Sequence, residues 1–106
     1  MQRLDVFFRP EALTDLQAIY RAVLDVSRSD MIASRFVERM MMRCRKIGDV
    51  PRGGRARDDL LPGLRTVPFE RSAVIAYRVA DQVEIPNVFY GGRDYEALYR
   101  DVDAAS

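Results

Sequence analysis

The sequence predicts an α+β fold in which an N-terminal strand and an antiparallel helical hairpin pack on a small antiparallel β-sheet. Between residues 10 and 47, apolar residues recur at three- and four-residue steps, as on amphipathic helices. Between residues 64 and 90, apolar and polar residues alternate in short runs separated by turn residues, as in a meander of strands. The length of 106 residues suits one domain, which we expect to span residues 1–106.

The first strand is expected from Arg3 to Phe8, because this segment is rich in β-favouring residues and ends before Pro10. Pro10 suits the first position of a helix, and Glu11 places negative charge where the helix dipole favours it. The helix is predicted to run to about Val26. Its apolar stripe contains Leu13, Leu16, Ile19, Tyr20, Val23 and Leu24.

A second helix follows the short connection "SRSD", in which Ser29 or Asp30 is the expected N-cap. It is predicted to end at Gly48. Such a short connection implies that the two helices form an antiparallel hairpin. The apolar face of the second helix contains Ala33, Phe36, Val37, Met40, Cys44 and Ile47.

The second half of the chain begins with a glycine- and proline-bearing segment, "GDVPRGGRARDDLLPG", which predicts a long surface loop. Strands are expected at residues 64–69, 72–80 and 83–90, with one face of the middle strand in the core. Pro86 cannot donate a ladder hydrogen bond and indicates an edge or a bulge, and a bulge lets Val83, Ile85 and Val88 all point inward. A short helix over residues 95–100 precedes a frayed "DVDAAS".

The composition excludes several classes of protein. A net charge of +1 excludes a strongly basic, histone-like protein. No apolar run is long enough to span a membrane, and the N-terminus lacks the pattern of a signal peptide, so a cytoplasmic location is expected. With no histidine and a single cysteine, the chain has no internal disulfide and no Ser-His-Asp triad, and we expect neither a metal nor a cofactor.

Four features admit a chemical and a structural interpretation. Cys44 lies on an apolar stripe, which favours a packed, inert thiol. Asp58 and Asp59 could attract a divalent ion, but adjacent acids in an arginine-rich loop are more typical of a salt-bridged turn. The "RGGRAR" loop has the glycines and cations of a phosphate cradle but lacks the Walker spacing. The methionines at 40–42 indicate core filler with one exposed position.

Three strand-associated arginines are candidates for binding a polyanion. Arg65 starts one strand, Arg78 lies on the next and Arg93 follows the last, and an antiparallel sheet could bring Arg65 and Arg93 towards one region. The alternative is that all three form rim salt bridges. Their potential partners are Asp58, Asp59, Glu70 and Asp94.

The ordered segments "PEALTDLQAIY", "CRKIGDVPRGGR", "LLPGLRTVPFERSAVIAYRV", "VEIPNV" and "GGRD" resemble the ParE branch of the RelE/ParE superfamily, the toxins of type II toxin-antitoxin pairs. The resemblance spans about Leu4 to Tyr99. Its most specific pieces are "PGLR", then "VIAYRV" nine residues later, then "GGRD". The resemblance implies the same fold that the periodicity predicts.

The superfamily includes ribonucleases that cut messenger RNA on the ribosome. The resemblance maps their five functional positions onto Arg65, Val67, Val74, Arg93 and Tyr99, where Val67 and Val74 replace basic residues. The loss of a guanidinium that stabilises the pentavalent phosphate removes several kcal/mol of electrostatic stabilisation, on the order of the oxyanion-hole effects measured in other enzymes. If the chain is a ribonuclease, Arg65, Arg93 and Tyr99 would carry the reaction, but cleavage is disfavoured.

The ParE branch implies a toxin that inhibits DNA gyrase by binding, without catalysis, and that is associated with plasmid stabilisation. It also implies a cognate, ParD-like antitoxin in a hetero-oligomeric complex, whose disordered segment folds along the toxin. A degenerate toxin that retains only antitoxin binding is a third hypothesis. The expected antitoxin contacts are Ile19, Tyr20, Val23, Arg65 and Arg78.

Overall fold

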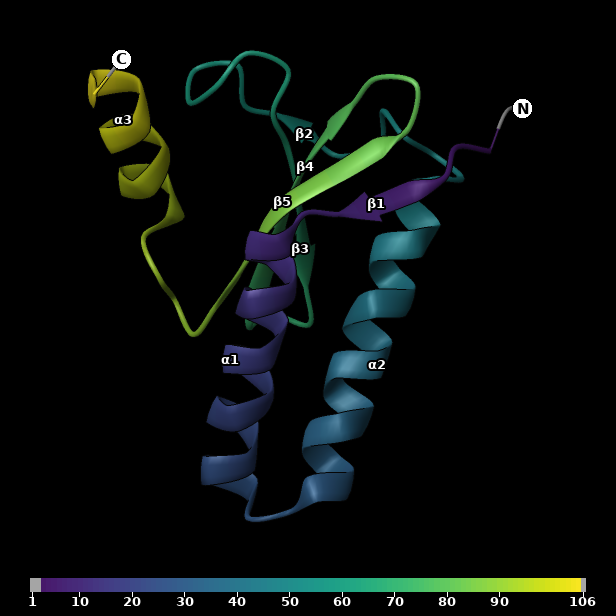
Figure 1. The fold of residues 1–106 in the computed structure, drawn as a ribbon, viewed down its shortest axis with the longest axis vertical. Helices are drawn as coiled ribbons and strands as arrows, with labels where there is room; N and C mark the ends of the chain where they lie inside the picture. Colours follow the sequence, from purple (N-terminus) through teal and green to yellow (C-terminus); the bar gives the residue numbers. More distant parts are fainter. Residues whose placement is uncertain (1–2, 106) are drawn as a thin grey trace.

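A computed structural model describes residues 3–105 and shows a helical hairpin beside a five-stranded sheet, with a third helix set apart from the hairpin (Figure 1). The predicted α+β fold is confirmed. The elements are β1 (Val6–Phe8), α1 (Pro10–Ser27), α2 (Asp30–Ile47), β2 (Arg55–Ala56), β3 (Arg65–Phe69), β4 (Ala73–Val79), β5 (Val83–Tyr90) and α3 (Tyr95–Ala105).

The strands lie in the order β1-β5-β4-β3-β2. The three predicted strands β3, β4 and β5 are antiparallel, as expected. The short strand β2, in the segment predicted as a loop, pairs antiparallel with β3, and β1 joins the sheet parallel to β5. β1 is shorter than expected, and α3 continues past residue 100 to Ala105 rather than fraying there. The end of the predicted frayed segment, Ser106, lies outside the described residues.

The helical hairpin is closed by local backbone signals. Pro10 is the first residue of α1, and Arg28 ends it in the left-handed conformation with a φ of 57°. Ser29, one of the two predicted caps, accepts a 3.2 Å hydrogen bond from the Ile32 amide at the start of α2. Leu13 was predicted to lie on the apolar stripe of this helix, and this was wrong, because Leu13 is 46% exposed. Ala12 lies on the buried face of α1 in its place.

The second helix packs the residues predicted for its apolar face. Cys44 and Met40 are fully buried, whereas Met42 is exposed, as expected for the methionine run. Burial raises the pKa of the Cys44 thiol to about 12, with a smaller opposing effect of Arg43 and Arg45, so the thiol is protonated and inert at neutral pH.

Gly48 permits a close approach of the N-terminal segment at the end of α2. The Leu4 amide donates a 2.9 Å hydrogen bond to the Gly48 carbonyl, and a Cβ at position 48 would collide with the Leu4 carbonyl oxygen. A glycine is therefore required where the start of the chain crosses the end of this helix.

A bulge in β5 brings three apolar residues to the helix-facing side. The register with β4 changes from Ala76 opposite Asn87 to Arg78 opposite Glu84, which leaves one extra residue on β5 at Ile85 and Pro86. The predicted bulge is confirmed, and β5 is a central strand rather than an edge. The residues on the helix-facing side are Val83, Ile85 and Val88, all buried.

The opposite face of the sheet is also packed, which the sequence analysis did not predict. Phe89 and Ala76 form a second apolar cluster with Leu60 and Leu64 of the loop and Tyr99 of α3. The prediction of one core face was therefore incomplete. The third helix and the loop before β3 seal the far side of β4 and β5.

The long loop contains the short edge strand β2 and is fastened to β4 by the phenol of Tyr77. The Tyr77 hydroxyl donates to the Pro51 carbonyl and accepts from the Gly54 amide, both at 2.8 Å. The guanidinium of Arg65 donates to the carbonyls of Arg52 and Gly54 at 3.1 and 2.9 Å. The glycine-rich segment is consequently held against the sheet.

Replacing Tyr77 with Phe is expected to lower the free energy of unfolding by about 1–3 kcal/mol, because both loop groups lose their partner in a buried setting. Urea denaturation measures the change. Tyr90→Phe is the matched control, since the Tyr90 hydroxyl has no hydrogen-bond partner among the described residues. Equal stability of the two variants would contradict the assigned role of the Tyr77 hydroxyl.

Candidate functional site

Two surface hollows meet at the end of β5 and share Tyr90 and Arg93. We call this surface the Arg93 groove. The sheet-side hollow, of about 220 Å³, is also lined by Arg71, Ser72, Ala73, Val74, Phe89, Gly92 and Tyr95. The helix-side hollow, of about 200 Å³, is also lined by Asp15, Ala18, Ile19, Ala22 and Val88.

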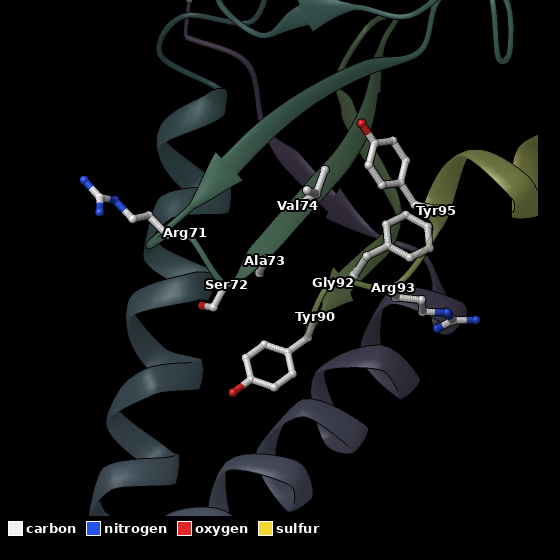
Figure 2. Close-up of a pocket in the computed structure, with 9 residues that line it drawn as sticks. Arg71, Ser72, Ala73, Val74, Tyr90, Gly92, Arg93 and Tyr95 are labelled. Carbon is white, nitrogen blue, oxygen red and sulfur yellow. The ribbon is translucent and has the colours of Figure 1, made fainter.

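Aromatic rings form a wall of the sheet-side hollow. Phe89 and Tyr95 are stacked with their centroids 5.5 Å apart, and the Arg93 guanidinium lies 5.6 Å from the Phe89 centroid. Arg71 and Arg93 lie on opposite sides of the hollow, and both side chains point outward (Figure 2). The hollow thus combines an apolar, aromatic surface with two guanidinium groups at its rim.

The rim charges are available to a ligand. Among residues 3–100, whose side chains the structure describes, no carboxylate lies within ion-pair distance of Arg71 or Arg93. Ser72 Oγ, at the same hollow, is buried without a hydrogen-bond partner. These groups are suited to binding carboxylates or phosphates next to apolar groups.

The helix-side hollow lies where β5 extends beyond the end of β1. Asp15 accepts hydrogen bonds there from the Val88 amide at 2.9 Å and the Asn87 side chain at 3.1 Å. Asp15 therefore satisfies a strand amide that β1, which ends at Phe8, does not reach. Small side chains on the adjacent turn of α1, Ala18 and Ala22, keep the hollow open.

Arg57 positions the aromatic wall and was not among the residues predicted from the sequence. This residue is only 6% exposed, and its guanidinium binds both oxygens of Asp59, the Tyr95 hydroxyl at 3.0 Å and Glu96 at 3.2 Å. The hydrogen bond to Asp59, followed by that to Glu96, raises the pKa of Arg57, and the same guanidinium lowers the pKa of Asp59. No local pattern in "RGGRAR" distinguishes this arginine from its exposed neighbours.

The predicted rim salt bridges are replaced by other pairs. Arg78 pairs with Glu84 at 3.3 Å, and Arg65 binds loop carbonyls rather than an acid. The four acids expected as partners have other contacts. Asp59 pairs with Arg57, Glu70 pairs with Arg39 at 2.9 Å, Asp58 accepts from the Gly63 amide, and Asp94 accepts from the Ala97 amide.

The structure does not bring Arg65 and Arg93 together, contrary to expectation. Arg65 faces Tyr77 on β4, whereas Tyr90, three residues before Arg93, faces Ala73. Four residues along a strand correspond to ~13 Å, and Arg93 lies beyond that point. The two guanidiniums are therefore at opposite ends of the sheet.

The remaining ribonuclease positions are also structural or apolar. Tyr99 is 5% exposed, and its hydroxyl donates to Asn87 Oδ1 at 3.2 Å. Burial, followed by the negative charge of Asp15, raises the pKa of Tyr99 to about 12, although Arg78 opposes the shift. Val67 is in the core, and Val74 lines the sheet-side hollow.

No group of three or more His, Cys, Asp or Glu side chains with the geometry of a metal site occurs within the described part of the chain. Of the helices described, none has the length and hydropathy needed to cross a bilayer.

The profile of one protein family, described as the ParE toxin of the type II toxin-antitoxin system parDE, matches residues 6–95. The chain belongs to the ParE toxin family. A solved structure described as the chromosomal ParDE TA system from P. aeruginosa has a TM-score of 0.72 and 23% identity, covering 84% of this chain and 97% of that chain. At this identity the match shows a shared fold. No curated protein matches the sequence significantly.

The residues expected to bind an antitoxin occupy different environments in this ParE-family chain. Ile19 and Val23 are 4% and 9% exposed and pack in the main core, although Ile19 also lines the helix-side hollow. Tyr20 is half-buried, and its hydroxyl donates to Asp30. Arg65 and Arg78 lie on the sheet, away from the Arg93 groove.

The Arg57→Met substitution is expected to release α3, because Tyr95 and Glu96 lose their shared donor. Amide hydrogen exchange at residues 95–100 should become about tenfold faster or more, while α1 and α2 keep their protection. Arg55→Met, which removes an exposed arginine two residues earlier, is the control and should leave α3 unchanged. Unaltered exchange in the Arg57 variant would show that α3 is held by the apolar cluster alone.

Proposed function

We propose that this chain is a ParE-like toxin that acts in the cytoplasm by binding DNA gyrase, and that a cognate ParD-like antitoxin neutralises it in a hetero-oligomeric complex. Membership of the ParE family supports the toxin role. Two observations favour binding over cleavage: Arg65 lies far along the sheet from Arg93, and Tyr99 is buried with its hydroxyl bonded to Asn87. A ribonuclease of this superfamily would need all three of Arg65, Arg93 and Tyr99 at one place.

Cleavage of a phosphodiester requires groups that move protons and stabilise the phosphate at one place. Here the Arg65 guanidinium holds the loop, and the Tyr99 phenol is buried with a pKa of about 12. Arg93 is exposed but stands beside aromatic rings rather than beside a base. A binding mechanism needs none of these groups to be close together.

The Arg93 groove is the surface that we propose for the antitoxin. Its two rim arginines, Arg71 and Arg93, complement an acidic segment, and its aromatic wall and the small side chains of α1 complement apolar anchors. Among the antitoxin contacts predicted from the sequence, Ile19 lines this surface, whereas Tyr20 is bonded to Asp30 outside the two hollows. Val23 packs in the main core, so it would support the antitoxin surface rather than contact the antitoxin. Arg65 and Arg78 would contact an antitoxin only if it extended across the sheet.

Purified chain added to gyrase is expected to block the supercoiling of relaxed plasmid, and a translating ribosome extract is expected to keep its messenger RNA intact. Adding the antitoxin encoded beside the toxin should restore supercoiling. Normal supercoiling at saturating toxin would contradict the gyrase assignment. Message cleavage that is lost in Tyr99→Phe would support the ribonuclease alternative, and capture of the antitoxin without any toxicity would support a degenerate toxin.

A variant pair separates the antitoxin surface from toxicity. Ala18→Glu places a long acidic side chain in the helix-side hollow, so this toxin should still block supercoiling but should resist neutralisation. Gln17→Glu adds the same charge at an adjacent exposed position outside the hollow and should be neutralised normally. Equal neutralisation of both variants would place the antitoxin elsewhere.

A further inference from the structure

Positive charge is concentrated in one part of the chain. Residues 43–65 contain seven Arg and Lys residues against three Asp residues, a net charge of +4, whereas the whole chain carries +1. The rest of the chain therefore carries −3. This segment includes the "RGGRAR" loop, most of which has no part in the Arg93 groove.

The fold gathers these cations around one hollow. A hollow of about 340 Å³ lies between the end of α2 and the loop, where Arg43 and Lys46 face Gly53 and Gly54. Arg52 and Arg55 flank the two glycines, and Arg65 is bonded to the loop carbonyls. We call this surface the basic face. It consists of Arg43, Lys46, Arg52, Arg55 and Arg65.

The acids of the same region do not neutralise the basic face. Asp49, which lines the hollow, pairs with Arg3 at 3.2 Å, and Asp59 pairs with Arg57. Asp58 accepts from the Gly63 amide. No member of the basic face takes part in an ion pair among the described residues, and Lys46, Arg52 and Arg55 are exposed.

We propose that the basic face binds the phosphate backbone of duplex DNA without sequence specificity. Its cations come from α2, the loop and the neighbouring strands β2 and β3, so they are spread over a surface rather than focused on one carboxylate. A regular series of phosphates matches such a spread, and binding of this kind is driven by the release of counterions. Gly54 lets the loop approach the Tyr77 ring closely, and Tyr77 and Arg65 hold the loop, with its arginines, in place.

The acidic-peptide alternative is less well supported at this surface. A folded peptide segment needs apolar pockets for its anchors as well as charge pairing. The Arg93 groove has aromatic rings for that purpose. In the hollow of the basic face, the apolar lining residues Ile47, Val67 and Tyr77 are buried, which leaves Val50 as its exposed apolar side chain. The proposal concerns the isolated chain and holds whether or not gyrase is the target.

Fluorescence anisotropy with a labelled duplex of about 30 base pairs, titrated at about 50–300 mM salt, tests the proposal. The logarithm of the association constant should fall with the logarithm of salt with a slope of about −4. In the Arg43→Ser/Lys46→Ser variant, the slope should become shallower by about 2 and binding near 0.1 M salt should weaken about 50-fold. Arg21→Ser/Arg100→Ser removes the same charge from exposed positions elsewhere and should bind as the unmodified chain does.

Circular dichroism establishes that each variant is folded. Arg52→Ser/Arg55→Ser is an independent variant on the loop and β2, and it should weaken binding to a similar extent. Absence of DNA binding by the unmodified chain, or equal loss in the Arg21/Arg100 control, would overturn the proposal. So would tenfold tighter binding of a labelled poly-glutamate peptide or of an RNA duplex of the same length.

Discussion

The extra residue in β5 at Ile85 and Pro86 is the constraint on which the rest of the fold depends. Val83 and Ile85 point towards the helices, and the extra residue lets Val88, three residues after Ile85, point the same way. The core under the hairpin is therefore continuous along β5. The same shift directs Phe89 to the opposite face, where it becomes the centre of a second cluster. One inserted residue therefore creates two packed faces on a single strand.

The bulge also determines the polar contacts near the candidate site. Asn87 lies just after the bulge. Its side chain accepts a hydrogen bond from the Tyr99 hydroxyl of α3 and donates one to Asp15 of α1, so it joins elements on both sides of the sheet. Phe89 stacks on Tyr95, and Arg57 holds Tyr95 in place by donating a hydrogen bond to the Tyr95 hydroxyl. Arginines in this chain thus have separate roles. Arg57 and Arg65 are structural. Arg71 and Arg93 at the groove have no ion pair among the described residues, and neither do Arg43, Lys46, Arg52 and Arg55 on the basic face.

The sequence predicted the elements whose signals are local. Ser29 as a cap and the helical stripes could be read from neighbouring residues, and the bulge at Pro86 followed from the missing donor of proline and the odd spacing around it. The environment of Arg57 depends on contacts with residues 38 and 39 positions away, which no local pattern specifies. For the same reason the loop clamp of Arg65 and its separation from Arg93 emerged only from the sheet register.

Tyr99 is a buried structural residue, and this supports our proposal that the ParE-family chain acts by binding. Because its folded pKa is raised, the folded state gains stability below the unfolded pKa and loses it as pH rises from 10.0 towards 12. Ultraviolet titration of the folded chain and of Tyr99→Phe, compared by difference, measures the Tyr99 pKa directly. We expect a value of about 12, with the phenol still protonated at pH values where circular dichroism shows an intact fold. Ionisation near the ordinary value of 10.0 in the folded chain would contradict it.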